Sequence, residues 1–190
     1  MEPLILAALL AQCAPLVHPQ TAAALIATES AANPHAIGVV GGSLQRQPRS
    51  RSEALATAAA LEADGWNYSV GLGQINRKNF AALGLKVDEA FDPCTNLTAM
   101  QTLLIDCYQR SAGTSASSQT AHASPGANGP AAEPAEAVTP KAVLPKAAPA
   151  QAFVRRALSC YYSGNFVTGF RHGYVARVVR SATTLAARPP

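Results

Sequence analysis

Apolar residues along the chain gather in blocks that polar and helix-breaking residues separate, and these blocks predict helices. Residues 4–14 and 19–31 are apolar or alanine-rich. Pro19 suits the first turn of a helix, and Asn33-Pro34 indicates a stop. Residues 51–63 predict another helix, with Ser52 as its cap and Gly65 as its end. Further helices are expected over about 77–82, 95–110, 152–162 and 173–181.

Glycine and proline mark the segments between these helices. Residues 38–50 contain Gly38, Gly41, Gly42 and Pro48 and predict a loop. Residues 65–76, GWNYSVGLGQIN, mix glycine with β-forming residues and predict a short β-hairpin or turn. No internal repeat is present, so a solenoid is not expected.

The segment 111–151 consists mainly of Ala, Pro, Ser, Thr and Gly. It cannot bury enough apolar area to offset its ordering entropy, which predicts a disordered insertion. The residues after it are too few for an independent domain. We therefore expect one domain formed by residues 1–110 and 152–180, interrupted by 111–151 and followed by a tail over 181–190.

Composition and charge limit the classes of function. The chain has 190 residues, 48% of them hydrophobic, and a net charge of +4, which is too small to argue for nucleic-acid binding. The sequence has no Walker loop, no GxGxxG, no HExxH and no membrane-spanning apolar run. The apolar N-terminus has signal-like length but lacks a basic start, so we interpret it as the first helix.

Four cysteines stand at positions 13, 94, 107 and 160 without a CxxC pair. An even count with this spacing fits two disulfides in an oxidising compartment. Four buried free thiols are the alternative. Neither the cysteines nor the four histidines have metal-ligand spacing, so no metal and no cofactor are expected.

Three stretches differ from the alanine-rich background: ESAANPHAIG from Glu29, GLGQIN from Gly71, and ALSCYYSGN from Ala157. Each combines glycine with amide, hydroxyl or phenol groups, which suit a neutral polar ligand such as a glycan. Taken singly, each has an ordinary explanation. A glutamate at a helix end is usually solvated, amides in a glycine turn are usually turn chemistry, and a tyrosine at helical spacing is usually part of the core.

In this order, the three stretches resemble the lysozyme-like lytic transglycosylases that cleave peptidoglycan. The resemblance is closest to the subgroup of type IV secretion and conjugation systems, and DPCTNL (residues 92–97) and CYYSGNFVTGF (residues 160–170) fit that subgroup. It covers about residues 10–110 and 152–180. It implies a mainly α-helical (α+β) lysozyme-like fold with a glycan cleft, a periplasmic location, and peptidoglycan strands and secretion components as partners.

The resemblance also implies site residues. Glu29 is the expected catalytic acid, and the substrate-binding residues expected beside it are Ser30, Gly73, Gln74, Asn76 and Tyr161. The family often has serine at Gly38 and asparagine at Tyr162, so this chain departs from the pattern there. The cysteine pairs that the resemblance implies are Cys13–Cys94 and Cys107–Cys160.

The carboxylates suggest a mechanism. Hydrolytic glycosidases usually use two, yet only Glu29 lies in a candidate site segment. We expect burial against Leu25 and Ile26, and the helix C-terminus, to raise the pKa of Glu29 so that it is protonated near neutral pH. It would then protonate the glycosidic oxygen and later accept the proton of the 6-hydroxyl, giving a 1,6-anhydro product.

Three other functions remain open on the sequence. A lysozyme-type hydrolase would release reducing-end sugars. A non-catalytic subunit would bind glycan or assemble with a secretion machine without cleaving. A scaffold would use its proline-rich segment as a docking ligand, although that segment lacks basic flanks and regular PxxP spacing.

Overall fold

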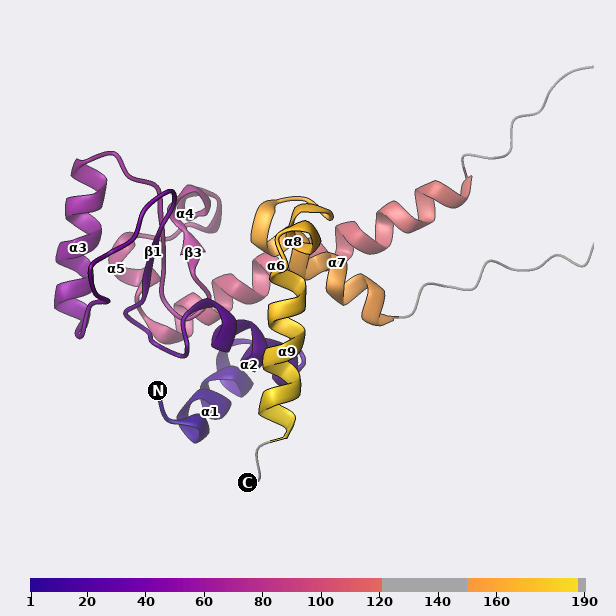
Figure 1. The fold of residues 1–190 in the computed structure, drawn as a ribbon, viewed down its shortest axis with the longest axis horizontal. Coiled ribbons are helices and arrows are strands. Elements are labelled where there is room, and N and C mark those ends of the chain that lie inside the picture. The colour runs from indigo at the N-terminus through magenta and orange to yellow at the C-terminus, as the bar shows by residue number, and fades with distance from the viewer. Residues whose placement is uncertain (121–149, 188–190) are drawn as a thin grey trace, which may run out of the picture.

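Helices form most of the chain, and a small sheet lies beside them (Figure 1). The computed structural model describes residues 1–120 and 150–187, and the mainly α-helical class expected from the sequence is confirmed. Over these residues, no helix is long and apolar enough to cross a membrane. The helices are α1 (Pro3–Cys13), α2 (Pro19–Glu29), α3 (Arg51–Ala63), the 3-10 turn η1 (Arg77–Asn79), α4 (Phe80–Leu83), α5 (Val87–Ala90), α6 (Pro93–Thr120), α7 (Ala150–Ser163), α8 (Thr168–Arg171) and α9 (Tyr174–Ala186).

Helix α2 follows its sequence signals, except at its end. Pro19 occupies its first turn, as expected. The helix ends at Glu29, two residues before the expected boundary, because Ala31 and Ala32 adopt φ angles of 51° and 59°. A left-handed backbone cannot continue a right-handed helix. Glu29 is therefore the last helical residue, at the negative end of the helix dipole.

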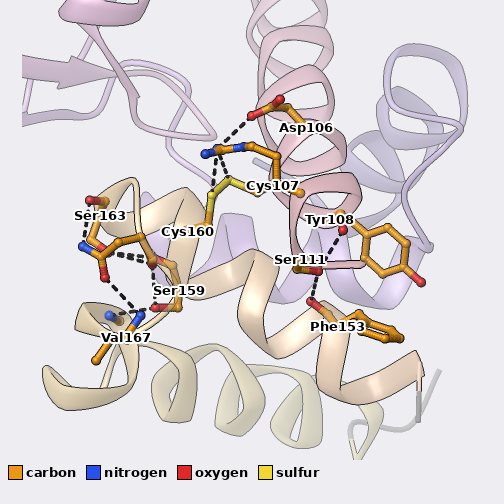
Figure 2. Close-up of a disulfide and its surroundings, with 12 residues drawn as sticks. Asp106, Cys107, Tyr108, Ser111, Phe153, Ser159, Cys160, Ser163 and Val167 are labelled. Carbon is orange, nitrogen blue, oxygen red and sulfur yellow. Dashed lines mark hydrogen bonds and ion pairs between the residues drawn. A yellow bond between two sulfur atoms is a disulfide. The ribbon is translucent and has the colours of Figure 1, made fainter. Parts of the chain in front are cut away.

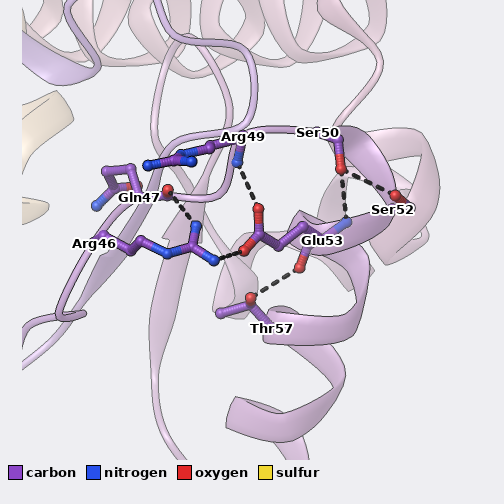
Figure 3. A network of polar contacts seen from close by, with 7 residues as sticks. All are labelled: Arg46, Gln47, Arg49, Ser50, Ser52, Glu53 and Thr57. Carbon is purple, nitrogen blue, oxygen red and sulfur yellow. Dashed lines mark hydrogen bonds and ion pairs between the residues drawn. The ribbon is translucent and has the colours of Figure 1, made fainter.

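Helix α3 has the bounds that the sequence predicts, but a different cap. The hydroxyl of Ser50, not Ser52, accepts a hydrogen bond from the Glu53 amide at 3.2 Å (Figure 3). The Ser52 hydroxyl lies 3.0 Å from that of Ser50. At the other end, Gly65 has a φ of 73° and follows the last turn, as expected.

The sheet has three antiparallel strands in the order β1 (Ile37–Val39), β2 (Tyr68–Val70) and β3 (Ile75–Asn76). Strands β2 and β3 form the hairpin that the sequence predicts, and β1 includes the first residues of the predicted 38–50 loop. The side chain of Gln47 covers the open edge of β1, since its amide accepts from Ile37 N at 2.8 Å and donates to Ile37 O at 2.9 Å. Arg46 and Arg49 bind Glu53 and tie this loop to α3 (Figure 3).

Helix α6 is longer than expected and runs into the segment predicted as an insertion. The sequence places disorder from residue 111, yet α6 continues to Thr120, and α7 begins at Ala150. Packing between the two helices gives a reason: the buried Ser111 hydroxyl donates to Phe153 O at 3.3 Å, and Tyr108 meets the Phe153 ring edge-on (Figure 2). The rest of the predicted insertion, residues 121–149, lies outside the described residues.

The last helix also extends beyond its predicted end. Helix α9 packs along α2 and runs to Ala186, so residues 181–186 of the expected tail are helical (Figure 1). Leu185 and Ala182 pack against the core, and the Ser181 hydroxyl lies 2.9 Å from that of Thr28 on α2. This packing brings the start of α9 to the end of α2, where Glu29 lies.

Two cysteine pairs connect distant parts of the chain. The sulfur atoms of Cys13, at the end of α1, and Cys94, at the start of α6, lie at bonding distance, and so do those of Cys107 on α6 and Cys160 on α7. These are the expected pairings. The second pair lies between the helices that precede and follow residues 121–149.

Candidate functional site

A cavity of about 630 Å³ lies between the sheet and the helices α6 and α7. The end of α2, the strands, η1, α6 and α7 all contribute to its wall. The lining residues are Glu29, Gly38, Val39, Val40, Ser69, Gln74, Asn76, Lys78, Asn79, Leu103, Asp106, Cys107, Arg110, Cys160, Tyr161, Tyr162, Ser163 and Gly164. Residues from all three of the chemistry-bearing stretches therefore meet in one place.

Glu29 reaches this cavity from the end of α2. The preceding turn contains Leu25 and Ile26, both fully buried, so the carboxyl lies in an apolar environment. Burial raises the pKa of Glu29 from 4.5 to about 7, against the opposing effects of the Tyr174 hydroxyl and the Arg177 charge. Near neutral pH the carboxyl can thus both donate and accept a proton.

Tyr174 is a neighbour of Glu29 that the sequence reasoning missed. Its hydroxyl donates a short hydrogen bond to Glu29 Oε1, and its side chain is buried at the start of α9. Burial and the neighbouring Glu29 raise the pKa of Tyr174 well above its usual value, so the phenol remains a donor. Its only sequence signal is its place, with Val175 and Val178, on the buried face of an amphipathic helix.

Gln74 is held in a strained turn opposite Gly38. Its φ of 49° is unusual for a residue with a side chain. Its Nε2 donates to Ala36 O at 3.1 Å and to Gly71 O at 2.9 Å. A Cβ on Gly38 would lie 2.7 Å from Gln74 Oε1, so the absence of a side chain at Gly38 leaves room for this oxygen. Both residues line the cavity.

Tyr161 is fixed by the turn that precedes Gln74. Its hydroxyl donates to Gly73 O at 2.6 Å, and burial and the nearby Glu29 raise its pKa. Gly73 does not itself line the cavity, but its backbone orients Tyr161. A Cβ on Gly73 would lie 2.9 Å from Met100 Cβ, so the turn packs closely on α6.

Asn96, on α6, stabilises this turn, and the sequence reasoning did not identify it either. It is buried, and its Oδ1 accepts from Gly73 N at 2.8 Å. Its Nδ2 donates to Val70 O at 3.0 Å and Ala90 O at 2.8 Å. The asparagine of DPCTNL therefore fixes the hairpin, which presents Gln74 and whose Gly73 carbonyl orients Tyr161 of α7. A fully satisfied buried amide of this kind specifies one backbone arrangement.

The remaining predicted site residues differ in their placement. Asn76 lines the cavity, donates to Ser69 Oγ at 3.1 Å and caps η1 through Lys78 N. Ser30 does not line the cavity: its hydroxyl donates back to Ile26 O at 3.3 Å at the end of α2. The cavity therefore gives no support to the expected binding role of Ser30.

A second carboxylate lines the cavity, which the sequence segments did not indicate. Asp106 on α6 forms an ion pair with Arg110 at 2.8 Å (Figure 2). The same guanidinium lies 3.4 Å from Cys107 Sγ and 3.0 Å from Cys160 Sγ. The Asp106 side chain is 60% exposed. A solvated, paired carboxylate differs from Glu29, whose apolar environment favours the protonated form.

Comparisons with known proteins find a matching family and several named relatives. The family described as "Transglycosylase SLT domain" matches residues 7–128. The type IV secretion system protein virB1 of Brucella abortus biovar 1 (strain 9-941) is 43% identical over 176 residues, covering 90% of this chain and 61% of the relative. Protein virB1 of Agrobacterium fabrum is 32% identical over 183 residues, covering 94% and 59%. The chain thus spans about three fifths of these relatives. No solved structure matches it significantly.

Proposed function

We propose that this chain, which belongs to the transglycosylase SLT domain family, is a peptidoglycan lytic transglycosylase. It cleaves the β-1,4 bond between N-acetylmuramic acid and N-acetylglucosamine and leaves a 1,6-anhydro end. The observation that carries the proposal is Glu29, which lies in the wall of the cavity and whose pKa burial raises to about 7. One carboxyl group can then serve both halves of the reaction.

In the first half of the reaction, protonated Glu29 donates its proton to the glycosidic oxygen, and the bond from this oxygen to the anomeric carbon breaks. Positive charge develops on the anomeric carbon, and the substrate's own acetamide stabilises it. In the second half, the Glu29 carboxylate accepts the proton of the 6-hydroxyl while that oxygen bonds to the anomeric carbon. The proton returns to Glu29 and no water is consumed.

The neutral groups around Glu29 support this assignment. Gln74, Asn76 and Tyr161 line the same cavity, and their amide and phenol groups suit acetamide and hydroxyl partners. The Tyr161 hydroxyl is already oriented by Gly73 O. A rigid site reduces the entropy lost when the sugar binds.

The hydrolase alternative usually uses a second catalytic carboxylate. Asp106 is the other acid in the cavity wall, and its pairing with Arg110 favours a structural role. This gives a matched pair of variants. Glu29→Gln should abolish cleavage of purified sacculi, whereas Asp106→Asn should retain most of it.

Mass spectra of the soluble muropeptides distinguish the reactions. The wild-type protein should release 1,6-anhydro ends. Reducing ends would establish a hydrolase, and loss of activity in Asp106→Asn would support a two-carboxylate mechanism. Binding of sacculi without cleavage by the wild type would indicate a non-catalytic glycan-binding subunit.

The cellular setting is also part of the proposal. Two relatives carry the name virB1, and one is called a type IV secretion system protein. We place this chain in the periplasm, acting on peptidoglycan strands where a secretion or conjugation apparatus crosses the wall. Fractionation of cells that express the full-length protein tests the location against periplasmic and cytoplasmic markers.

Oxidised cysteines would agree with this location. We propose that Cys13–Cys94 and Cys107–Cys160 are disulfides in the exported protein, since their sulfur atoms lie at bonding distance. Peptide mapping without reduction should recover both linked pairs. Recovery of free Cys107 or Cys160 peptides from periplasmic protein would contradict the second pair.

A further inference from the structure

Tyr162 is an exposed aromatic residue in the wall of the cavity that the proposed proton transfers do not use. It follows Tyr161 on α7, lines the cavity and is 42% exposed. Single exposed aromatic residues on a protein surface need no explanation. A large aromatic residue exposed inside a concave site is different, because any ligand that fills the site contacts it.

The ring of Tyr162 is held in place from two sides. One face stacks on Tyr174, with ring centroids 4.5 Å apart and planes inclined by 17°. Its hydroxyl lies 3.3 Å from His172 Nδ1, and the two rings meet edge-on with centroids 6.0 Å apart. His172 and Tyr174 come from the end of α8 and the start of α9. The Tyr162 ring is thus ordered by tertiary contacts although it is exposed.

A preorganised ring has a specific use in a glycan site. A pyranose ring has faces of C–H groups that are apolar, while its hydroxyls project from the edge. A flat aromatic side chain contacts such a face over a large area, and its polar tip remains free for hydrogen bonding. Because the ring is already fixed, little side-chain entropy is lost when a sugar stacks on it.

The position of the ring relative to the proposed acid defines which sugar it contacts. Tyr174 lies between the two groups: its ring stacks on Tyr162, and its hydroxyl donates to Glu29. A sugar stacked on the Tyr162 ring is therefore adjacent to the glycosidic oxygen that Glu29 protonates.

We infer that Tyr162 is a sugar-stacking platform that binds the pyranose next to the scissile bond, a role that rests on the proposed action on peptidoglycan. The platform recognises the β-1,4-linked N-acetylhexosamine backbone. This recognition requires the aromatic ring of Tyr162 and not the Tyr162 hydroxyl. It acts in substrate binding and not through the protonation of Glu29.

Binding to an uncleaved oligosaccharide tests this role separately from catalysis. Chitohexaose, a β-1,4-linked N-acetylglucosamine oligomer, is titrated by calorimetry into the full chain carrying Glu29→Gln. Adding Tyr162→Leu, which removes the ring, should weaken binding and raise the Kd about five- to tenfold. Adding Tyr162→Phe, which keeps the ring, should change it less than about twofold. Tyr108→Leu removes another exposed tyrosine that lies outside the cavity, and it should leave the Kd unchanged.

A fluorescence measurement tests the same inference independently, should Tyr162→Leu fail to fold. The chain has one tryptophan, Trp66, which does not line the cavity. The indole introduced by Tyr162→Trp should become less solvent-accessible when chitohexaose is added, which a blue-shifted emission and reduced iodide quenching would report. An emission that does not respond to saturating chitohexaose would overturn the platform.

The remaining outcomes separate this inference from the proposed function. Equal affinity of Tyr162→Leu and its parent, or equal losses in the Leu and Phe variants, would overturn the platform. So would a change in the kcat of Tyr162→Leu on sacculi, or in its pH profile, with no change in the Kd. If ring-dependent binding is found but the wild type does not cleave sacculi, the platform stands and the transglycosylase assignment fails.

Discussion

Replacing Glu29 by glutamine should stabilise the protein at neutral and alkaline pH, because it removes a carboxyl group that burial disfavours as an anion. The carboxyl lies beside fully buried aliphatic side chains at the end of α2. Glutamine has nearly the same shape and retains an oxygen that can accept the Tyr174 hydroxyl. The variant therefore changes the ionisation more than the packing.

The size of the effect follows from the pKa of Glu29. Burial raises this pKa from 4.5 to about 7, and each pH unit between the two values corresponds to about 1.4 kcal/mol. Between these values the unfolded chain releases the proton while the folded chain retains it, so rising pH lowers the free energy of unfolding of the wild type. Glu29→Gln does not undergo this loss and should be more stable by about 3 kcal/mol above pH 7.

Urea denaturation of both proteins from about pH 4 to pH 8.5, with the cysteines oxidised, measures the difference. The two free energies of unfolding should be similar near pH 4 and separate as the pH rises. Glu2→Gln is the matched control, since Glu2 is exposed, and its profile should follow the wild type. If the difference in the free energy of unfolding between Glu29→Gln and wild type stayed constant with pH, the folded protein would not retain a proton on Glu29.

Three further predictions concern activity on sacculi. The rate should fall as pH rises through about 7, because the first step requires protonated Glu29; a rate that still rises at pH 8 would contradict this. Tyr174→Phe should move this fall to higher pH and lower the rate at pH 6 about tenfold, since its hydroxyl lowers the pKa of Glu29 and orients it; an unshifted profile would show that the hydroxyl has no such effect. Gly38→Ala places a Cβ 2.7 Å from Gln74 Oε1 and should reduce the rate at least about tenfold with little change in Tm, whereas Gly42→Ala, with its nearest contact at 3.5 Å, should match the wild type.

The sequence predicts the fold best where local signals are complete. Helix α3 begins and ends where its alanine-rich run and Gly65 indicate. The continuation of α6 past residue 110 is missed because Ser111 finds its partner, Phe153, beyond the proline-rich segment. A helical turn supported by such a distant contact is not visible in local propensity. The short helices α5 and α8 were missed because four residues give no measurable periodicity.

The site shows the same division between local and distant signals. Glu29, Gln74 and Tyr161 lie in the three stretches that carry the family resemblance, which implies their roles, and the structure brings all three to one cavity. The roles of Tyr174 and Asn96 are not found, although Asn96 lies in the DPCTNL stretch, because both act through contacts far along the chain. Their chemistry arises only when the helices pack.

The pKa of Glu29 reflects a balance that suits a group used twice in one reaction. Burial alone would keep the carboxyl protonated, which favours donation to the glycosidic oxygen but hinders the later acceptance of a proton. The Tyr174 hydroxyl and the Arg177 charge, both from α9, oppose burial and bring the pKa back to about 7. At that value the energetic cost of either protonation state is small near neutral pH. The C-terminal helix therefore contributes to the proposed catalysis by tuning an acid that the second helix supplies.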